Sequence, residues 1–460
     1  MSWRNPIYEN LVLPVTEPDS CRGLAGRLRI WEERESLPSR QLQEMRWQSL
    51  RQMLRHAFQT STFYRRRMEE AGVHPDRMQS FADLQQIPEL TREDIRQHAD
   101  AMVSRDFRKE DLLPSATGGT TDTPVRFWRD RAALREKAAV QWRWNARAGF
   151  RPGDRTFYLW GATVDYAENP SWRWRLYDQH LMRRVWAPTS KFNEQVLEQY
   201  RRMLLQQKPE ILYAYPTPVS LLAQYLRETG ASAARPRAVI CTAEPLLAHQ
   251  RQLLEEVFAC PVIEHYGSRE FGMIAGGCGQ GDTLHVNPLA AHVEYVPVAD
   301  AGGLCSLVVT DLLNYAMPLI RYRINDCALP PANDACACGL SYPRFSPIAG
   351  RVADVFRLSN GDIIPGVALT NRVLKECPGL KKTQIIQEDW DRFRIRFVPG
   401  PGFSADDLAL LQRNLCSFFP IPLHWEFEQV QDIERERSGK TRFCISRVQG
   451  QPVQRAGTSA

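Results

Sequence analysis

The spacing of apolar residues changes twice along the chain. Across residues 31–100 apolar side chains recur every three or four positions, which predicts amphipathic helices. The clearest series is Leu42, Met45, Trp47, Leu50, Met53, Leu54 and Ala57. Ser80-Phe81-Ala82-Asp83 and Thr91-Arg92-Glu93-Asp94 are capping-box patterns that mark two helix starts, and Pro88 separates them. We expect this segment to form the helical edge of a larger domain.

From about residue 111 short apolar runs alternate with amphipathic segments. The runs predict strands at 156–160, 210–213, 238–241, 262–266 and 304–310. The segments predict helices at 194–207, 218–228 and 247–258. Strands that alternate with helices indicate an α/β architecture with a largely parallel sheet. The aromatic-rich stretch 142–186 is less regular, and it suits either a pocket lining or a core.

After about residue 350 the pattern changes again. Strands are predicted at 355–358, 383–387, 392–398 and 424–429, with helices at 369–375 and 405–416. This describes a small α+β domain of about a hundred residues, a common domain size. The predicted fold class is therefore α/β, with a large multi-sheet N-terminal domain (residues 1–352) and a small α+β C-terminal domain (residues 353–460).

Composition excludes several classes of protein. Lys and Arg number 59 against 53 Asp and Glu, a net charge of +6 that is mild for 460 residues, and no long basic run indicates nucleic-acid binding. Residues 1–14 lack the order of a signal peptide, and no run approaches the roughly 18 apolar residues of a membrane span. We therefore expect a cytoplasmic protein. Its eleven cysteines, irregularly spaced, favour free thiols and metal ligands over disulfides.

One stretch is rich in glycine and hydroxyl side chains. It runs from Pro114 to Pro124 and includes Ser115, Thr117, Gly118, Gly119, Thr120 and Thr121. Glycines let a backbone approach a ligand closely, and hydroxyls with free N–H groups suit phosphate oxygens. The same composition is typical of ordinary turns. The stretch is not a Walker loop, because no Gly-Lys-Ser/Thr follows at the required spacing.

Four further segments carry candidate chemistry. Cys241-Thr242-Ala243-Glu244-Pro245 ends a predicted strand, where open α/β sheets bind ligands. His265-Tyr266-Gly267-Ser268-Arg269-Glu270 offers an aromatic face for a base and a carboxylate for a hard metal ion. Residues 318–326 end in Asp326, which could accept hydrogen bonds from two sugar hydroxyls, and Gly350-Arg351 follows. In Ser438-Gly439-Lys440 the lysine could stabilise developing phosphate charge. Each segment alone also suits a turn or a surface.

Together and in this order, the five segments resemble the adenylate-forming superfamily of acyl-CoA synthetases. The similarity is greatest to its phenylacetate–CoA ligase-like branch, including the capsular polysaccharide biosynthesis type. Thr117-Gly118-Gly119-Thr120-Thr121-x-x-Pro124 resembles the phosphate loop of that family, and Tyr266-Gly267-Ser268-x-Glu270 resembles its adenine and Mg²⁺ motif. Residues 318–326 resemble the ribose-binding segment, Gly350-Arg351 the pre-hinge motif and Ser438-Gly439-Lys440 the catalytic-lysine segment.

The resemblance implies a role for each matched residue. Ser115 and residues 117–121 would hold the ATP phosphates, and Tyr266 would stack on adenine, with Gly267 and Ser268 beside it. Ala243, Glu244 and Pro245 would form the other wall of the adenine site. Glu270 would hold Mg²⁺, and Asp326 with Arg351 would bind the ribose hydroxyls. Lys440 would bridge the substrate carboxylate and the α-phosphate.

The implied activity is ATP-dependent conversion of a carboxylic acid to an acyl-adenylate, with release of pyrophosphate and transfer of the acyl group to CoA. The alternatives are transfer to an amine or to a carrier-protein thiol, or a non-catalytic nucleotide- or acyl-binding relative. The resemblance also implies that residues 1–352 bind ATP and the acid. Residues 353–460 would be a mobile domain that carries the lysine, with Ala353 or Asp354 as its hinge.

Three departures from the family pattern stand out. The loop ends Asp122-Thr123-Pro124 where Gly-x-Pro is usual, and a carboxylate beside triphosphate is an unfavourable neighbour unless it faces solvent or a cation. Asn325 precedes Asp326, a mild exchange because Asn tolerates positive φ. Ala353 stands where the hinge is commonly Asp or Lys.

The acyl-pocket candidates, chosen for their place at strand ends, are Trp160, Tyr215, Pro216 and His265. His265 also suits a satisfied core histidine.

The cysteines give a sixth signal. Cys278-x6-His285 and Cys336-x-Cys338 together make a Cys₃His set, which suits a closed, structural, tetrahedral Zn²⁺ site. Isolated thiols are the alternative that spacing leaves open. Members of the phenylacetate–CoA ligase-like branch carry such a zinc site near the active-site motif, so the resemblance favours the metal. We expect Cys241, Cys260 and Cys327 to be small buried hydrophobic residues.

Overall fold

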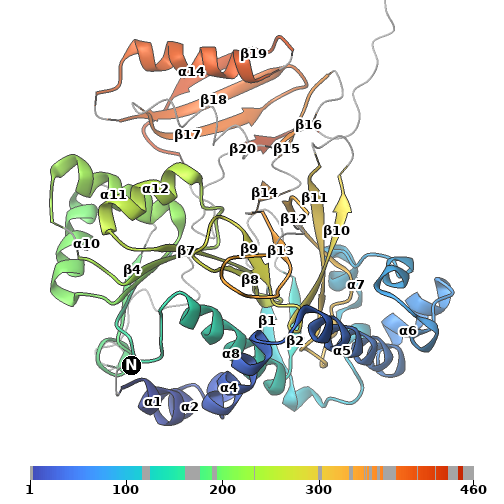
Figure 1. The fold of residues 1–460 in the computed structure, drawn as a ribbon. Coiled ribbons are helices and arrows are strands. Elements are labelled where there is room, and N and C mark those ends of the chain that lie inside the picture. Colours follow the sequence, from blue (N-terminus) through green and yellow to red (C-terminus); the bar gives the residue numbers. More distant parts are fainter. Residues whose placement is uncertain are drawn as a thin grey trace, which may run out of the picture.

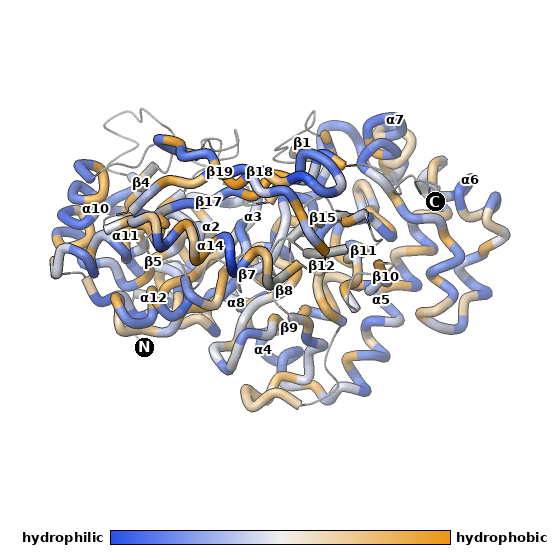
Figure 2. Tube along the Cα trace, turned by 90° about the horizontal axis from the view of Figure 1, so that it is seen from above, coloured by the Kyte–Doolittle hydropathy of each residue, from blue (hydrophilic) through white to orange (hydrophobic). Residues whose placement is uncertain are grey.

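The computed structural model describes most of the chain. It covers residues 4–116, 125–160, 177–188, 194–232, 234–298, 303–330, 335–346, 348, 350–351, 355–359, 363–365, 380–400, 402–419, 421–433 and 444–448. In Figure 1 a larger body made of the N-terminal and central residues lies below a smaller body made of the C-terminal residues. Seen from above, α10–α12 lie at one end of the larger body and α5–α7 at the other, with β7 and β8 between them (Figure 2).

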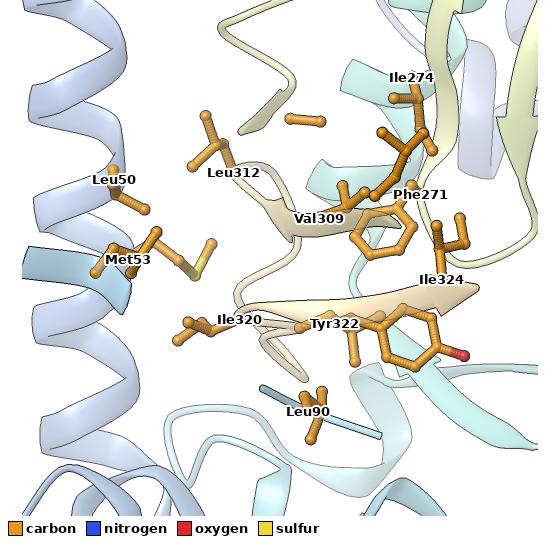
Figure 3. Packing of buried hydrophobic residues seen from close by; sticks show 14 of the residues in the cluster. Leu50, Met53, Leu90, Phe271, Ile274, Val309, Leu312, Ile320, Tyr322 and Ile324 are labelled. Carbon is orange, nitrogen blue, oxygen red and sulfur yellow. The ribbon is translucent and has the colours of Figure 1, made fainter. Parts of the chain in front are cut away.

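The N-terminal segment is helical, as its apolar spacing predicts. Its helices are α1 (Arg4–Ile7), η1 (Tyr8–Val12), α2 (Leu13–Thr16), α3 (Pro18–Cys21), α4 (Leu24–Glu35), α5 (Ser39–Thr60), α6 (Thr62–Glu70), η2 (Pro75–Arg77), η3 (Phe81–Gln86), α7 (Arg92–Met102) and η4 (Lys109–Asp111). The capping box at α7 is formed, because the Asp94 N–H donates to Thr91 Oγ1 at 3.1 Å and the Thr91 N–H donates to Asp94 Oδ2 at 2.8 Å. Leu50 and Met53 of α5 pack against Ile320 and Leu312 (Figure 3).

An eight-stranded sheet forms the centre of the larger body, in the order β13-β9-β8-β7-β6-β5-β3-β4. Its strands are β3 (Thr156–Trp160), β4 (Arg184–Pro188), β5 (Ile211–Ala214), β6 (Ala238–Thr242), β7 (Val262–Ser268), β8 (Gly272–Gly277), β9 (Leu284–Val286) and β13 (Arg344–Phe345). The helices in this region are α8 (Arg131–Arg147), η6 (Tyr177–Leu181), α10 (Glu194–Gln207), α11 (Pro216–Thr229) and α12 (Ala248–Phe258). Apolar side chains of α10–α12 pack on one face of β3, β5 and β6, and α8 with its following turn packs on the other.

The prediction of a largely parallel sheet holds only for part of the structure. Strands β3 to β7 pair in parallel, whereas β8, β9 and β13 are antiparallel. A second sheet, β10-β11-β12-β14, is wholly antiparallel. Its strands are β10 (Ala291–Pro297), β11 (Cys305–Asp311), β12 (Tyr322–Ala328) and β14 (Gly350–Arg351). Seven residues separate β10 from β11 and ten separate β11 from β12, which is too few for the crossover that parallel neighbours require.

A separate hairpin carries the predicted phosphate stretch. Strands β1 (Leu113–Ala116) and β2 (Arg126–Arg129) pair antiparallel, with Ser115 opposite Phe127.

The C-terminal residues form an α+β unit, as predicted. It comprises β15 (Val355–Arg357), β16 (Ile363–Pro365), β17 (Leu380–Gln387), β18 (Arg392–Pro399), α14 (Ala405–Phe418), β19 (His424–Gln429) and β20 (Cys444–Ser446).

The core of the C-terminal unit forms where α14 packs on its four-stranded sheet. Leu411 and Leu415 of the helix contact Phe393 and Ile395 of β18, and all four are fully buried. The predicted helix 369–375 and the predicted domain boundary after residue 352 lie outside the described residues. The boundary and the mobility of this unit therefore stay predictions. Among the described helices, none combines the length and the apolar character that a bilayer crossing requires.

Candidate functional site

Tyr266 and Asp326 meet where the two large sheets adjoin. The Tyr266 hydroxyl on β7 donates a 2.8 Å hydrogen bond to Asp326 Oδ2 on β12. Asp326 lies opposite Arg351 in the β12–β14 register. The structure thus brings together the residues predicted for adenine and ribose, although only the backbone of Arg351 is described. Asn325 has a φ of 66°, a positive value that asparagine tolerates, as expected from the sequence.

The turn after Tyr266 requires glycine. A Cβ atom placed on Gly267 would lie 2.3 Å from the carbonyl oxygen of Gly272, a contact that real side chains do not make. Ser268 Oγ accepts a hydrogen bond from the Phe271 N–H at 3.3 Å, which closes the same turn. Close pairing of β7 with β8 therefore orients both Tyr266 and the glutamate that follows.

Glu270, the predicted Mg²⁺ ligand, is almost fully buried. Its Oε1 accepts a 3.3 Å hydrogen bond from the Tyr322 hydroxyl. Figure 3 shows the Tyr322 ring beside Phe271, with its hydroxyl directed away from the labelled apolar side chains. Arg92 also faces this group: burial alone would lower the pKa of Arg92, but the Tyr322 hydroxyl and the carboxylates of Glu270 and Asp326 raise it. Sequence reasoning assigned Arg92 no role beyond its place in a capping-box pattern.

A buried lysine lies behind Glu270. Lys137 Nζ on α8 donates to the backbone oxygen of Glu270 at 2.8 Å and to Asp311 Oδ2 at 2.5 Å. The side chains of Lys137 and Asp311 are 7% and 1% exposed, so water hardly screens the pair. Sequence reasoning missed Lys137. The available signal was its place on the buried stripe of α8, at helical spacing from Ala133 and Trp144.

Asp311 extends this contact to the phosphate hairpin. Its Oδ1 accepts from the N–H groups of Leu313 at 2.9 Å and Asn314 at 3.3 Å. The Asn314 amide in turn donates to the carbonyl of Trp128 on β2 at 2.9 Å. One hydrogen-bonded chain therefore links the Glu270 turn to the hairpin that carries the phosphate stretch.

Several predicted site residues lie outside the described part of the chain. These are Thr117, Gly118, Gly119, Thr120, Thr121, Ala353, Asp354 and Lys440, together with Asp122. Their assignments stay predictions. Residues 117–122 fall between the two strands of the hairpin in the sequence, since β1 ends at Ala116 and β2 begins at Arg126.

The segment predicted as the second adenine wall follows β6. Ala243 has a φ of 72°, a conformation that reverses the chain sharply. Glu244 is buried, and its Oε2 accepts a 3.0 Å hydrogen bond from the Thr217 N–H in the first turn of α11. A carboxylate at this position is stabilised by the positive end of the helix. Glu244 thus fastens α11 to the strand end, and the role of residues 243–245 toward adenine stays a prediction.

The acyl-pocket candidates form an aromatic group at the strand ends. The rings of Trp160 and Tyr215 lie 4.7 Å apart, and Pro216 begins α11. His265 is 1% exposed, its Nδ1 lies 3.5 Å from the Tyr213 hydroxyl, and burial lowers its pKa to about 3. His265 is therefore a neutral buried histidine, and its role toward the acid stays a prediction. Trp160 lines a cavity of about 300 Å³, together with Tyr158 and Tyr213.

The Cys₃His set is assembled at the edge of the eight-stranded sheet. The ligand atoms of Cys278, His285, Cys336 and Cys338 all lie within 4.8 Å of one another. The Cys278 and Cys336 sulfurs are 3.7 Å apart, and Cys338 Sγ is 3.4 Å from His285 Nε2. A tetrahedral Zn²⁺ with bonds of about 2.3 Å to sulfur and about 2.0 Å to nitrogen needs separations of about 3.8 and 3.5 Å. Burial lowers the pKa of His285 to about 4, which keeps the imidazole neutral at pH 7.

The other cysteines divide by burial. Cys241 and Cys327 are buried, as expected, whereas Cys260 is partly exposed. Burial and the Glu264 charge raise the pKa of the Cys241 thiol, so this group stays a neutral thiol.

Comparisons with known proteins match this architecture. The CapK C-terminal domain family matches residues 357–447. Protein CapK of Staphylococcus aureus is 23% identical over 408 residues, covering 88% of this chain and 89% of that protein. A phenylacetate-coenzyme A ligase of Thermus thermophilus is 26% identical over 346 residues, covering 72% and 75%.

Solved structures show the same fold. A 2-hydroxyisobutyryl-CoA ligase in the postadenylation state, in complex with R3-HIB-AMP, superimposes with a TM-score of 0.72 at 22% identity, over 90% of this chain and 91% of that chain. An anthranilate CoA ligase in complex with anthranoyl-AMP gives a TM-score of 0.52 at 15% identity, over 74% and 67%. The resemblance read from the motifs is confirmed: the chain is similar in sequence to CapK and to the phenylacetate–coenzyme A ligases, and it has the fold of the adenylate-forming acyl-CoA ligases.

Proposed function

We propose that the protein activates a carboxylic acid with ATP as an acyl-adenylate, releases pyrophosphate and transfers the acyl group to the CoA thiol. The observation that carries this proposal is the Tyr266–Asp326 hydrogen bond beside the buried Glu270 carboxylate. Relatives with this fold are acyl-CoA ligases, and one of them is solved with an acyl-AMP and CoA together.

In the first step an oxygen of the substrate carboxylate attacks the α-phosphorus of ATP, and the bond to the pyrophosphate oxygen breaks. Both reactants are anions, so the site must neutralise them and hold them in line. Tyr266 and residues 243–245 hold the adenine, and Asp326 accepts hydrogen bonds from the ribose while Tyr266 fixes its orientation. Arg92 supplies a cation beside Glu270 and Asp326, and Lys440 is assigned to the reacting carboxylate and the α-phosphate.

Glu270 fits a hard divalent cation. Its carboxylate is buried yet retains lone pairs beyond the one that Tyr322 engages, and oxygen ligands are those that Mg²⁺ prefers. When bound, Mg²⁺ would neutralise phosphate charge. In the second step the CoA thiol gives up its proton to solvent and its sulfur attacks the acyl carbonyl carbon, and AMP departs with the bonding electrons of the acyl–oxygen bond.

We assign a structural Zn²⁺ to Cys278, His285, Cys336 and Cys338. Four protein ligands leave no open position, which is the property of a structural and not a catalytic site. Such an ion would fasten the loop before β13 to the β8–β9 hairpin, at the end of β8 opposite the Glu270 turn.

Acid-dependent release of pyrophosphate, with acyl-CoA detected by mass spectrometry, tests the whole reaction. We expect pyrophosphate only when acid and ATP are both present, and acyl-CoA only when CoA is added. Acyl-adenylate without thioester would favour an amine or a carrier-protein thiol as acceptor. ATP binding without pyrophosphate release, across aryl and aliphatic acids, would favour the non-catalytic alternative.

A further inference from the structure

The cavity of about 300 Å³ lies between α8, the first strands of the parallel sheet and the N-terminal segment. Five aromatic side chains line it, together with the polar side chains of Gln141, Asn145 and Asp154; the aromatic ones are Trp142, Phe150, Tyr158, Trp160 and Tyr213. The N-terminal segment contributes Leu13, Glu17 and Cys21 to the lining. The volume is at the lower end of small-molecule sites, which hold about 300–1,000 Å³.

The cavity extends along β3. Thr156 and Trp160, the first and last residues of this strand, both line it, so it runs for about 13 Å at roughly 3.3 Å per residue. Its Trp160 end adjoins the nucleotide site. The Trp160 ring contacts the Tyr215 ring, and the Tyr213 hydroxyl lies 3.5 Å from His265 Nδ1. His265 immediately precedes Tyr266 in β7. The Thr156 end is the end remote from the nucleotide site.

The remote end is charged although the walls are aromatic. Arg184 opens β4 beside Thr156, and its Nη2 lies 2.7 Å from Glu17 Oε1 of the N-terminal segment. The second oxygen, Glu17 Oε2, lies 3.7 Å from Cys21 Sγ. Both members of the ion pair line the cavity and keep a quarter to a third of their side-chain surface exposed. The ion pair at the remote end therefore keeps polar groups available to an acid that fills the cavity.

We infer that this cavity receives the part of the acid remote from its carboxyl group, and that the Glu17–Arg184 pair selects acids with a hydroxyl or similar hydrogen-bonding group at that end. The inference rests on the proposed adenylation. A purely apolar tail would strip water from the ion pair without replacing its hydrogen bonds, which disfavours that acid. A tail that carries a hydroxyl replaces the lost water, and its ring or chain packs on the aromatic walls.

The test uses two matched pairs of acids: phenylacetate with 4-hydroxyphenylacetate, and octanoate with 8-hydroxyoctanoate. Acid-dependent pyrophosphate release gives kcat/KM for each acid, and calorimetric titration with each acid alone gives its Kd. We expect the hydroxylated member to be preferred by about tenfold or more in at least one pair, in both measurements. The double substitution Glu17→Gln with Arg184→Met removes the pair, and the preference should fall at least tenfold. Asp178, which also faces Arg184, keeps its hydrogen bond from Trp186 Nε1.

The control makes the same two substitutions in the exposed pair of α5, Glu44→Gln with Arg40→Met, and it should keep the preference. Equal use of both members, preference for the apolar member, or a preference that survives the Glu17/Arg184 substitution would overturn the inference. These results differ from failure of the proposed function, in which the acids bind with the expected preference but none releases pyrophosphate.

Discussion

The ammonium of Lys137 lies 2.5 Å from the carboxylate of Asp311 and 2.8 Å from the backbone oxygen of Glu270, in a place that water barely reaches. This pair ties α8 to the ends of β7 and β11. A buried charge that loses its partner is strongly unfavourable, so the pair has a larger effect on stability than an exposed ion pair would.

The Lys137→Met variant should therefore lose about 3–5 kcal/mol of unfolding free energy in urea, because the Asp311 charge stays buried without its partner. The double variant Lys137→Met with Asp311→Asn should recover a large part of that loss, because the neutral amide keeps an oxygen for the Leu313 and Asn314 N–H groups. Lys109→Met, at an exposed position of η4, serves as the control and should stay within about 0.5 kcal/mol of the wild type. A single variant as stable as the control would show that the pair contributes nothing.

Gly267→Ala tests the close approach of β7 and β8. The added methyl group would lie 2.3 Å from the Gly272 oxygen, so the turn must open and both Tyr266 and Glu270 must shift. We expect the KM for ATP to rise at least tenfold, measured by pyrophosphate release. Gly26→Ala is the matched control, because nothing lies within 4 Å of the added atom in α4. An unchanged KM for ATP in Gly267→Ala would mean that the turn does not orient the nucleotide site.

The Cys₃His cluster predicts one bound zinc ion per chain, retained through exhaustive dialysis. Cys338→Ser should lower the zinc content measured by elemental mass spectrometry and should lower Tm, because the loop before β13 would lose its attachment. Cys416→Ser, at an exposed free cysteine of α14, should change neither quantity. Zinc content far below one per chain in the wild-type protein would exclude the assignment.

Glu264 predicts a pH dependence of stability. Burial raises the pKa of its carboxyl to about 7, above the value of 4.5 for an exposed group, so the folded state binds a proton that the unfolded state releases. Stability from this group is present below about pH 4.5 and is lost as pH rises to about 7, a change of about 3 kcal/mol. Glu264→Gln should remove this decline in urea unfolding between pH 5 and pH 8. The exposed Glu255→Gln should leave it unchanged, and an unchanged decline in Glu264→Gln would assign it to another group.

Features that depend on local sequence patterns were predicted more completely than features that depend on long-range contacts. The apolar stripe of α5 and the capping box at Thr91 were predictable because a few nearby residues decide each one. The Cys₃His set was predictable from the ligand types and spacing of its two short motifs, although 58 residues separate Cys278 from Cys336. Lys137, Asp311 and Asn314 were not, because their roles arise from elements that meet only in the folded chain. The antiparallel pairing of β10 to β12 was also missed, since apolar runs alone do not give strand direction.

Glu244 has a contact that its place in a recognised motif did not predict. Its carboxylate caps α11 through the Thr217 N–H, a contact that only the folded chain reveals. Its predicted role toward the nucleotide stays a prediction. The Glu17–Arg184 contact likewise joins residues far apart in the sequence, so spacing alone could not predict it.

The most direct test of the central claim is isotope exchange between labelled pyrophosphate and ATP, in the presence of a carboxylic acid and the absence of CoA. Reversible acyl-adenylate formation predicts exchange that depends on the acid. Tyr266→Phe, which removes the hydrogen bond to Asp326, should slow the exchange at low ATP concentration, whereas the partly buried Tyr225→Phe on α11 should not. Acid-dependent exchange with this pattern supports the account. No exchange with any aryl or aliphatic acid, on folded protein that binds ATP, would contradict it.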